Sequence, residues 1–227
     1  MEQEHHLLKQ SNLRDQALSI LKLRLISGDL APGKIYSASA LAEELGVSNS
    51  PVREAMLTLV NHGLMETVRN RGFRVVHFSD KERQNVYDLR ILLEVPSMVK
   101  LARLSERVRP RKEEFAHIAA DMVNFAKEGN IAGYLEMDHR FHLELLAILE
   151  NEQLVAIVEN LRAQSRQYGL KALRGSGGLV KSAEEHQPIL DAIVAGDTEL
   201  TSRLMTSHLN HFMSDWAGLM TVAGGTA

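Results

Sequence analysis

The stretch LAEELGVSNSPVREAMLTLVNHGL, residues 41–64, decides the fold of the N-terminal part of the chain. It contains two segments with apolar residues at helical spacing, separated by the short connection Gly46-Val47-Ser48. The first segment covers residues 38–45 and ends at Gly46, because glycine readily adopts the left-handed backbone that follows a helix. Ser48 can cap the second segment. Two short helices joined in this way indicate a helix-turn-helix motif.

The flanking residues extend this motif to a winged helix. Residues 12–27 have an apolar face at helical spacing, and a short extended piece is expected around Ile35. Further on, the segments LMETV and FRVVHF have the length of strands, and their apolar residues either alternate with polar ones or follow one another. Arg69-Asn70-Arg71-Gly72 between them has the composition of a turn. This order of elements predicts a winged helix-turn-helix domain over residues 1–78.

From Ser79 onward the pattern is helical alone. Glycine, proline and asparagine interrupt it at short connections, which predicts an antiparallel all-α bundle over residues 79–227. The six expected helices cover residues 81–107, 111–128, 131–149, 152–173, 179–195 and 198–222. The chain is therefore expected to be mainly α, with two domains of ordinary size.

Composition excludes several classes of protein and leaves DNA binding open. The net charge is −3. Residues 1–78 have 9 Lys and Arg against 8 Asp and Glu, and the remainder has 17 against 21, so a local basic face would have to contact phosphates. We expect no contact with membranes, because no apolar run could span a bilayer. Without a secretory signal pattern or any cysteine, we expect a cytoplasmic protein with no thiolate metal site.

The second helix of the motif begins with residues that can reach DNA base edges. Arg53 could bind guanine or a phosphate, and Arg69 and Arg71 at the hairpin tip could lie against the minor groove or the backbone. Winged helices also bind proteins, so Arg53 could instead be a solvated helix residue. The pattern favours double-stranded DNA, with small polar contact residues at Ser48, Asn49 and Ser50.

The ten histidines suggest a metal site by position rather than by number. Asp138 and His142 are four residues apart on a helix and share its apolar face. His186 and His208 lie in two further apolar helical segments, and His211 is a possible substitute for His208. One carboxylate and three imidazoles would suit a divalent ion such as zinc or nickel, with positions open for a ligand. The alternative is a set of unrelated core or surface histidines.

Arg90 is a candidate ligand for a small carboxylate. Its planar guanidinium suits that task, and it lies among leucines in a domain of net negative charge. It could instead form a helix salt bridge with Glu94, four residues further on. Arg162 and Arg166 are weaker candidates for the same pocket.

The N-terminal motifs resemble the GntR family of transcription regulators. The resemblance implies that Arg53 contacts base or backbone from the recognition helix and that Gly72 is the glycine of the wing. Ser39 and Asn49 stand where many members have arginine, so the usual operator sequence is not expected. The matching stretches are LAPGK at 30–34, LAEELGVSNSPVREAM at 41–56, Leu59 and Gly63-Leu64.

The C-terminal half resembles the FCD sensor domain of the FadR-type branch of that family. The six helices expected here resemble the shorter VanR-like variant of the domain more than its seven-helix form. In the family, an aspartate and three histidines hold a divalent metal, and a small organic acid often completes the coordination. The resemblance implies this role for Asp138, His142, His186 and His208, on the matching stretches DLRILLE at 88–94, Asp138 to His142, HQPILDAIVAGD at 186–197 and MTSHL at 205–209.

Together these features predict a metabolite-responsive transcription regulator and not an enzyme. We expect a homodimer that reads a palindromic operator, with a small organic carboxylate as effector. A metal-dependent hydrolase or lyase is the rival, because Asp and three His can also activate water. No Ser or Cys nucleophile motif supports that rival. A regulator whose metal site is purely structural is the third possibility.

Overall fold

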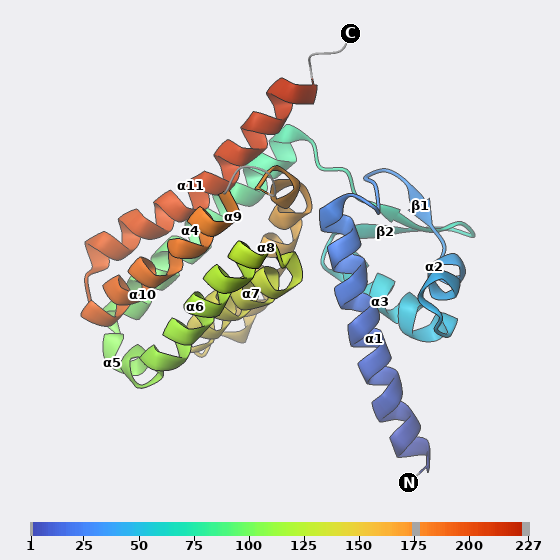
Figure 1. Ribbon diagram of the computed structural model, residues 1–227, viewed down its shortest axis with the longest axis horizontal. Coiled ribbons are helices and arrows are strands. Elements are labelled where there is room, and N and C mark those ends of the chain that lie inside the picture. Colours follow the sequence, from blue (N-terminus) through green and yellow to red (C-terminus); the bar gives the residue numbers. More distant parts are fainter. Residues whose placement is uncertain (1, 174–177, 224–227) are drawn as a thin grey trace. The chain divides into compact units, whose positions relative to one another are not determined.

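The structure is a computed structural model that describes the backbone of residues 2–173 and 178–223 and the side chains of residues 13–166 and 178–210. The chain divides into two compact units, residues 1–80 and 81–227. Figure 1 shows helices together with a small sheet in the first unit and helices in the second. The prediction of a mainly α chain with an N-terminal winged helix-turn-helix is confirmed.

The N-terminal unit has the predicted order of elements. These are α1 Glu2–Ser27, β1 Ile35–Tyr36, α2 Ala38–Leu45, α3 Asn49–Asn61, β2 Met65–Val68 and β3 Gly72–Val75. Helix α1 begins ten residues earlier than expected. At the start of α2, Ser37 Oγ accepts a hydrogen bond from the Ala40 N–H, and at its end Gly46 has φ of 66°. Ser48 lies at the N-cap of α3, but its side chain makes no capping hydrogen bond.

The sheet is antiparallel, with strand order β1-β3-β2. Ile35 pairs with Arg74, and Met65 pairs with Val75. Its inner face joins a core of residues from all three helices, which includes Leu21, Leu41, Met56, Leu59, Phe73 and Val75. Burial of these side chains fixes α3 and the β2–β3 hairpin relative to each other within the N-terminal unit.

The C-terminal unit is helical throughout its described residues. Its elements are α4 Asp80–Arg103, α5 Ser105–Val108, the 3-10 turn η1 Arg109–Arg111, α6 Lys112–Glu128, α7 Ile131–Ala147, α8 Glu152–Leu173, α9 Gly178–Glu184, α10 His186–Ala195 and α11 Thr198–Ala223. Large side chains such as Phe115, Tyr134, Phe141 and Leu145 are fully buried between the helices.

Two of the predicted helices differ from those in the structure. The helix expected over 81–107 ends at Arg103 and is followed by the single turn α5. The helix expected over 179–195 is two helices, α9 and α10, that meet at Glu185. The count of six was therefore wrong, and it gives no support to the shorter VanR-like variant.

Pro188 favours the break at Glu185, although α4 accommodates Pro96 in its interior. A proline in the interior of one long helix would lack an N–H and would clash with the carbonyl four residues earlier. The break places Pro188 in the first turn of α10, where that N–H has no helical partner to lose. His186 consequently becomes the first residue of α10, a position that matters for the site below.

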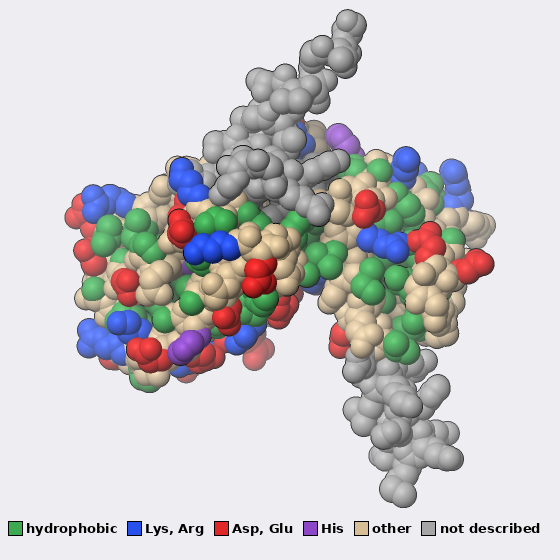
Figure 2. Space-filling view, in the orientation of Figure 1, with side chains coloured by type: hydrophobic (Ala, Val, Ile, Leu, Met, Phe, Trp, Pro, Cys, Tyr) green, Lys and Arg blue, Asp and Glu red, His purple; other side chains and the backbone are tan. Residues whose placement is uncertain are grey.

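The surface has no excess of one charge on the face that Figure 2 shows. Acidic and basic side chains are interspersed over both units there. This agrees with the small net charge of the chain.

Candidate metal centre and nucleic-acid interface

Three helices of the C-terminal unit bring the predicted metal ligands together. Asp138 and His142 lie on α7, His186 begins α10, and His208 lies on α11. Each offers one ligand atom, and these four atoms all lie within 4.8 Å of one another. All four side chains are buried. His211, the possible substitute ligand, has its side chain outside the described residues.

The packing of α7 explains why its two ligands face inward. Asp138, Phe141 and His142 all belong to its buried face. The ring of Phe141 packs edge-on against the rings of His142 and His186, with centroids 5.3 and 4.9 Å apart. The aromatic contact holds both imidazoles in place without occupying their nitrogens.

The arrangement of the ligand atoms fits a cation. His142 Nε2 lies 3.1 Å from His186 Nε2, and Asp138 Oδ1 lies 3.7 Å from the first and 3.4 Å from the second. Asp138 Oδ1 is buried and has no hydrogen-bond partner among the described residues. A carboxylate oxygen and imidazole nitrogens that converge in this way can be satisfied by one divalent ion.

Neighbouring groups orient two of the imidazoles. His186 Nδ1 donates to the carbonyls of Ser182 and Ala183, at 3.0 and 3.1 Å. His208 Nδ1 donates to Glu185 Oε2 at 2.8 Å. Because these oxygens only accept, each Nδ1 carries the proton and each Nε2 keeps its lone pair for the site. No pattern in the sequence pointed to Glu185, although it directly precedes the predicted ligand His186.

An ion-pair network of buried residues adjoins the ligands. Glu94 on α4 accepts hydrogen bonds from Arg90 Nε and from Arg162 Nη1, both at 2.6 Å. Arg162 Nη2 also donates to Asp138 Oδ2 at 2.7 Å, and Arg166 Nη2 contacts the same oxygen. Arg162 of α8 therefore connects α4 to Asp138, the predicted metal ligand on α7.

Arg90 has the partner that the sequence left open as an alternative. Besides its bond to Glu94, its Nη1 donates to Ser165 Oγ at 3.0 Å. The side chain is almost completely buried. Arg90 is thus part of the network beside the metal ligands, and a bound carboxylate would have to compete with Glu94 or Ser165 for it.

Burial determines the charge of these groups. It lowers the pKa of His142 well below its ordinary value, and Arg162 adds to this effect. It also lowers the pKa of His186 and of His208 to about 4. Burial raises the pKa of Glu94, but Arg90 and Arg162 outweigh it and bring it to about 2. At neutral pH the imidazoles are therefore neutral, the form that coordinates metal, and Glu94 is ionised.

The predicted DNA contacts at the start of α3 are exposed. The buried residues of this helix, including Val52, Ala55 and Met56, hold its other side in the core. The Arg53 guanidinium lies 5.9 Å from the centre of the Phe73 ring, which can support it by a cation–π contact. The exposed set is Ser48, Asn49, Ser50 and Arg53.

The β2–β3 hairpin presents two cations. Arg69 and Arg71 are exposed on either side of Asn70, which has φ of 58°. Gly72 follows with φ of 116°, and a Cβ there would lie 2.3 Å from the carbonyl oxygen of Tyr36 on β1. Gly72 therefore allows the wing to pack against β1, which accounts for glycine there without any DNA contact.

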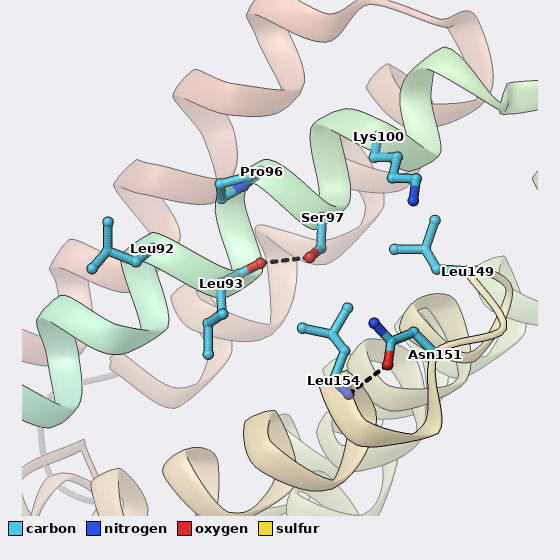
Figure 3. Close-up of a pocket in the computed structure, with 8 residues that line it drawn as sticks. All are labelled: Leu92, Leu93, Pro96, Ser97, Lys100, Leu149, Asn151 and Leu154. Carbon is cyan, nitrogen blue, oxygen red and sulfur yellow. Dashed lines mark hydrogen bonds between the residues drawn. The ribbon is translucent and has the colours of Figure 1, made fainter.

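A separate pocket of about 210 Å³ lies in the C-terminal unit (Figure 3). Leu93 and Ser97 of α4 lie opposite Leu154 of α8, and Leu92 also lines the pocket. Asn151 Oδ1 accepts from the Leu154 N–H at 3.0 Å and so caps α8. None of the four predicted metal ligands lines this pocket.

Comparisons with known proteins agree with both halves of this description. Residues 13–75 match the family "Bacterial regulatory proteins, gntR family", and residues 85–211 match the FCD domain. The chain is 27% identical to the gluconate operon transcriptional repressor of Bacillus subtilis over 75% of this chain and 68% of that protein. It is 26% identical to a probable D-xylose utilization operon transcriptional repressor of Paenarthrobacter nicotinovorans over 91% and 89%.

Solved structures support the fold. The structure of E. coli McbR/YncC matches with a TM-score of 0.75 at 23% identity, over 92% of this chain and 98% of that one. Within the described residues, no helix combines the length and apolar composition that a membrane span requires. The winged helix, the helical unit and the two family matches lead to one conclusion: the chain belongs to the GntR family of transcription regulators and carries a C-terminal FCD effector-binding domain.

Proposed function

We propose that this regulator senses a small organic acid at a divalent metal ion held by Asp138, His142, His186 and His208. The observation that carries the proposal is the buried Asp138 Oδ1, which has no hydrogen-bond partner within the described part of the chain and lies 3.4 Å from His186 Nε2. The nitrogen and oxygen ligands suit zinc or nickel. A bound divalent ion would supply positive charge and open coordination positions for a carboxylate.

The residues of the chain itself would prepare the site for this ligand. The carbonyls of Ser182 and Ala183 and the carboxylate of Glu185 hold His186 and His208 in the tautomers that coordinate metal. Arg90 could pair with a ligand carboxylate if it exchanged its bond to Ser165. The same network would then report on occupancy, because Glu94 and Arg162 join α4 to α7.

The N-terminal unit would bind the operator. Arg53, with Ser48, Asn49 and Ser50, would enter the major groove, and Arg69 and Arg71 would contact backbone or minor groove. We propose a homodimer on a palindromic site, since two-fold symmetry in the protein is matched by symmetry in the operator. The relatives that are repressors of a gluconate operon and of a D-xylose utilization operon support control by a metabolite.

Three measurements on one preparation test this proposal. Mass spectrometry should find one divalent ion per chain, and chelation should remove it. A mobility-shift assay with the promoter region beside the chain's own gene should show specific binding. Titration of metabolites into that complex should release or tighten the DNA for a specific acid, because an effector acts only through different affinity for two states.

The same measurements decide against the rival functions. A metal site that is purely structural would bind its ion, and no metabolite would change DNA affinity. A metal-dependent hydrolase or lyase would turn over a substrate in a screen with metal-loaded protein. The metal ligands would then serve to activate water rather than to sense an acid.

A further inference from the structure

We propose that the ligand of this sensor site is a small organic dianion, with one carboxylate at the metal and the second paired with Arg162 and Arg166. The inference rests on the function proposed above and names the class of ligand. Three independent features of the buried site support it: its charge balance, an unsatisfied donor on Arg162, and the partial exposure of Arg166.

The first feature is the balance of charge. Among the described residues that hydrogen bonds join to this network, three guanidinium groups face three carboxylates, so these six side chains are together formally neutral. Imidazoles that coordinate metal are neutral as well. A divalent ion therefore adds two positive charges in a buried place, where uncompensated charge is costly. A dianion restores neutrality, whereas a monocarboxylate leaves one charge unbalanced. The six groups are Arg90, Arg162, Arg166, Glu94, Asp138 and Glu185.

The second feature is a donor without an acceptor. Arg162 is 3% exposed and uses Nη1 for Glu94 and Nη2 for Asp138. Its Nε is buried and has no hydrogen-bond partner among the described residues. In the planar guanidinium, Nε lies on the same edge as Nη2, so the missing acceptor belongs beside Asp138. A ligand carboxylate at this edge would accept from Nε while another carboxylate of the same molecule reached the metal.

The third feature is that Arg166 can change partner. Its Nη2 contacts Asp138 Oδ2, an oxygen that already accepts from Arg162 Nη2. Its side chain is 12% exposed, against 3% for Arg162 and 4% for Arg90. Arg166 can therefore turn toward an incoming anion while Arg162 keeps Asp138 paired. Arg166 is therefore the residue that distinguishes a dianionic ligand from a ligand with a single negative charge.

Calorimetry on metal-loaded protein tests the proposal. Malonate, succinate and glutarate are each compared with their monomethyl esters at fixed ionic strength, because each ester keeps the carbon skeleton and loses one charge. At least one of these dianions should bind about tenfold tighter than its ester, as expected for one charge-assisted contact. Arg166→Gln should remove that preference by weakening the dianion and should leave the affinity of the ester unchanged.

Matched variants separate this role from loss of structure. Arg140→Gln makes the same change on α7, where Arg140 pairs with Glu144 outside the network, and it should keep the preference. Arg166→Lys keeps the charge and should retain part of it, and circular dichroism reports whether each variant folds.

The proposal is overturned if dianions and esters bind equally, if Arg166→Gln weakens both alike, or if none of the six probes binds the loaded protein. Metal content and operator binding of the same samples are measured separately. A failure of the proposed function would appear there.

Discussion

The Nε2 atoms of His142 and His186 lie 3.1 Å apart in a buried site. His186 donates from Nδ1 to backbone carbonyls, so its Nε2 presents a lone pair. A proton on His142 Nε2 or a cation has to lie between the two nitrogens, because two facing lone pairs would repel. The proposed metal binding would therefore require a change of tautomer at His142 alone, while His186 and His208 already have the orientation that coordination needs.

The free energy of unfolding of the metal-free protein should fall as pH falls from about 6.5 to about 4. Burial lowers the pKa of His186 and of His208 to about 4, so the unfolded chain binds more protons in this window. Each histidine contributes about 1.4 kcal/mol per unit of pKa shift at most. Below about 4.5 the loss should continue, because the pKa of Glu94 is lowered to about 2.

Urea unfolding of chelated protein at pH 7.5, 6 and 5 measures this effect. His117 is exposed, and His117→Gln should follow the wild-type curve. A stability that stays constant between pH 7.5 and pH 5 would show that these imidazoles are not buried as neutral groups.

Arg53→Ala should weaken operator binding by about 1–3 kcal/mol, as expected for the loss of a specific arginine contact. Arg53 is exposed at the start of α3, and its stacking over Phe73 contributes little to stability at an exposed position. Quantitative mobility shifts at fixed salt measure the change, with Arg103→Ala in the C-terminal unit as the control. Unchanged affinity in folded Arg53→Ala protein would contradict the assignment.

Arg71→Ala should lower affinity for all DNA sequences more evenly than Arg53→Ala does. Arg71 is exposed at the hairpin tip, where contact with backbone or minor groove reads little sequence. The slope of log affinity against log salt should fall by about one, as for one lost phosphate contact. A loss confined to a single base-pair position of the operator would rule this role out.

Local patterns were sufficient to predict the winged helix. Gly46 ends α2 and the turn residues at 69–72 form the hairpin, because these features depend on neighbours a few residues apart. The pairing of Asp138 with His142 on one face followed from helical periodicity in the same way. The break between α9 and α10 also had a local signal, since Pro188 would cost a backbone hydrogen bond inside one long helix.

The sequence offered only the Arg90–Glu94 pair of the ion-pair network, because these two residues lie four apart on one helix. Arg162 joins Glu94, 68 residues away, to Asp138, 24 residues away, and only the packed bundle brings these helices together. The hydrogen bond between Glu185 and His208 was unpredictable for the same reason, because it joins residues 23 positions apart at the break between α9 and α10. The contacts that join different helices around the site are therefore those for which the sequence had no local signal.

His142→Ala should remove most of the bound metal and lower thermal stability while operator binding persists. The variant lacks one of four ligands and leaves Asp138 Oδ1 with a neighbour that cannot coordinate. Metal that binds the folded state stabilises it by mass action, by about 2.7 kcal/mol at a hundred times its dissociation constant. The winged helix is a compact unit of its own, so loss of the metal should not unfold it.

His139→Ala is the matched control. His139 also lies on α7 and is partly exposed, but it does not belong to the ligand cluster. Mass spectrometry before and after chelation, thermal melts and mobility shifts are run on all three proteins. If the wild type holds no stoichiometric metal after loading with zinc or nickel, or if His142→Ala retains it fully, the four residues are polar core groups and the proposed sensor mechanism is wrong.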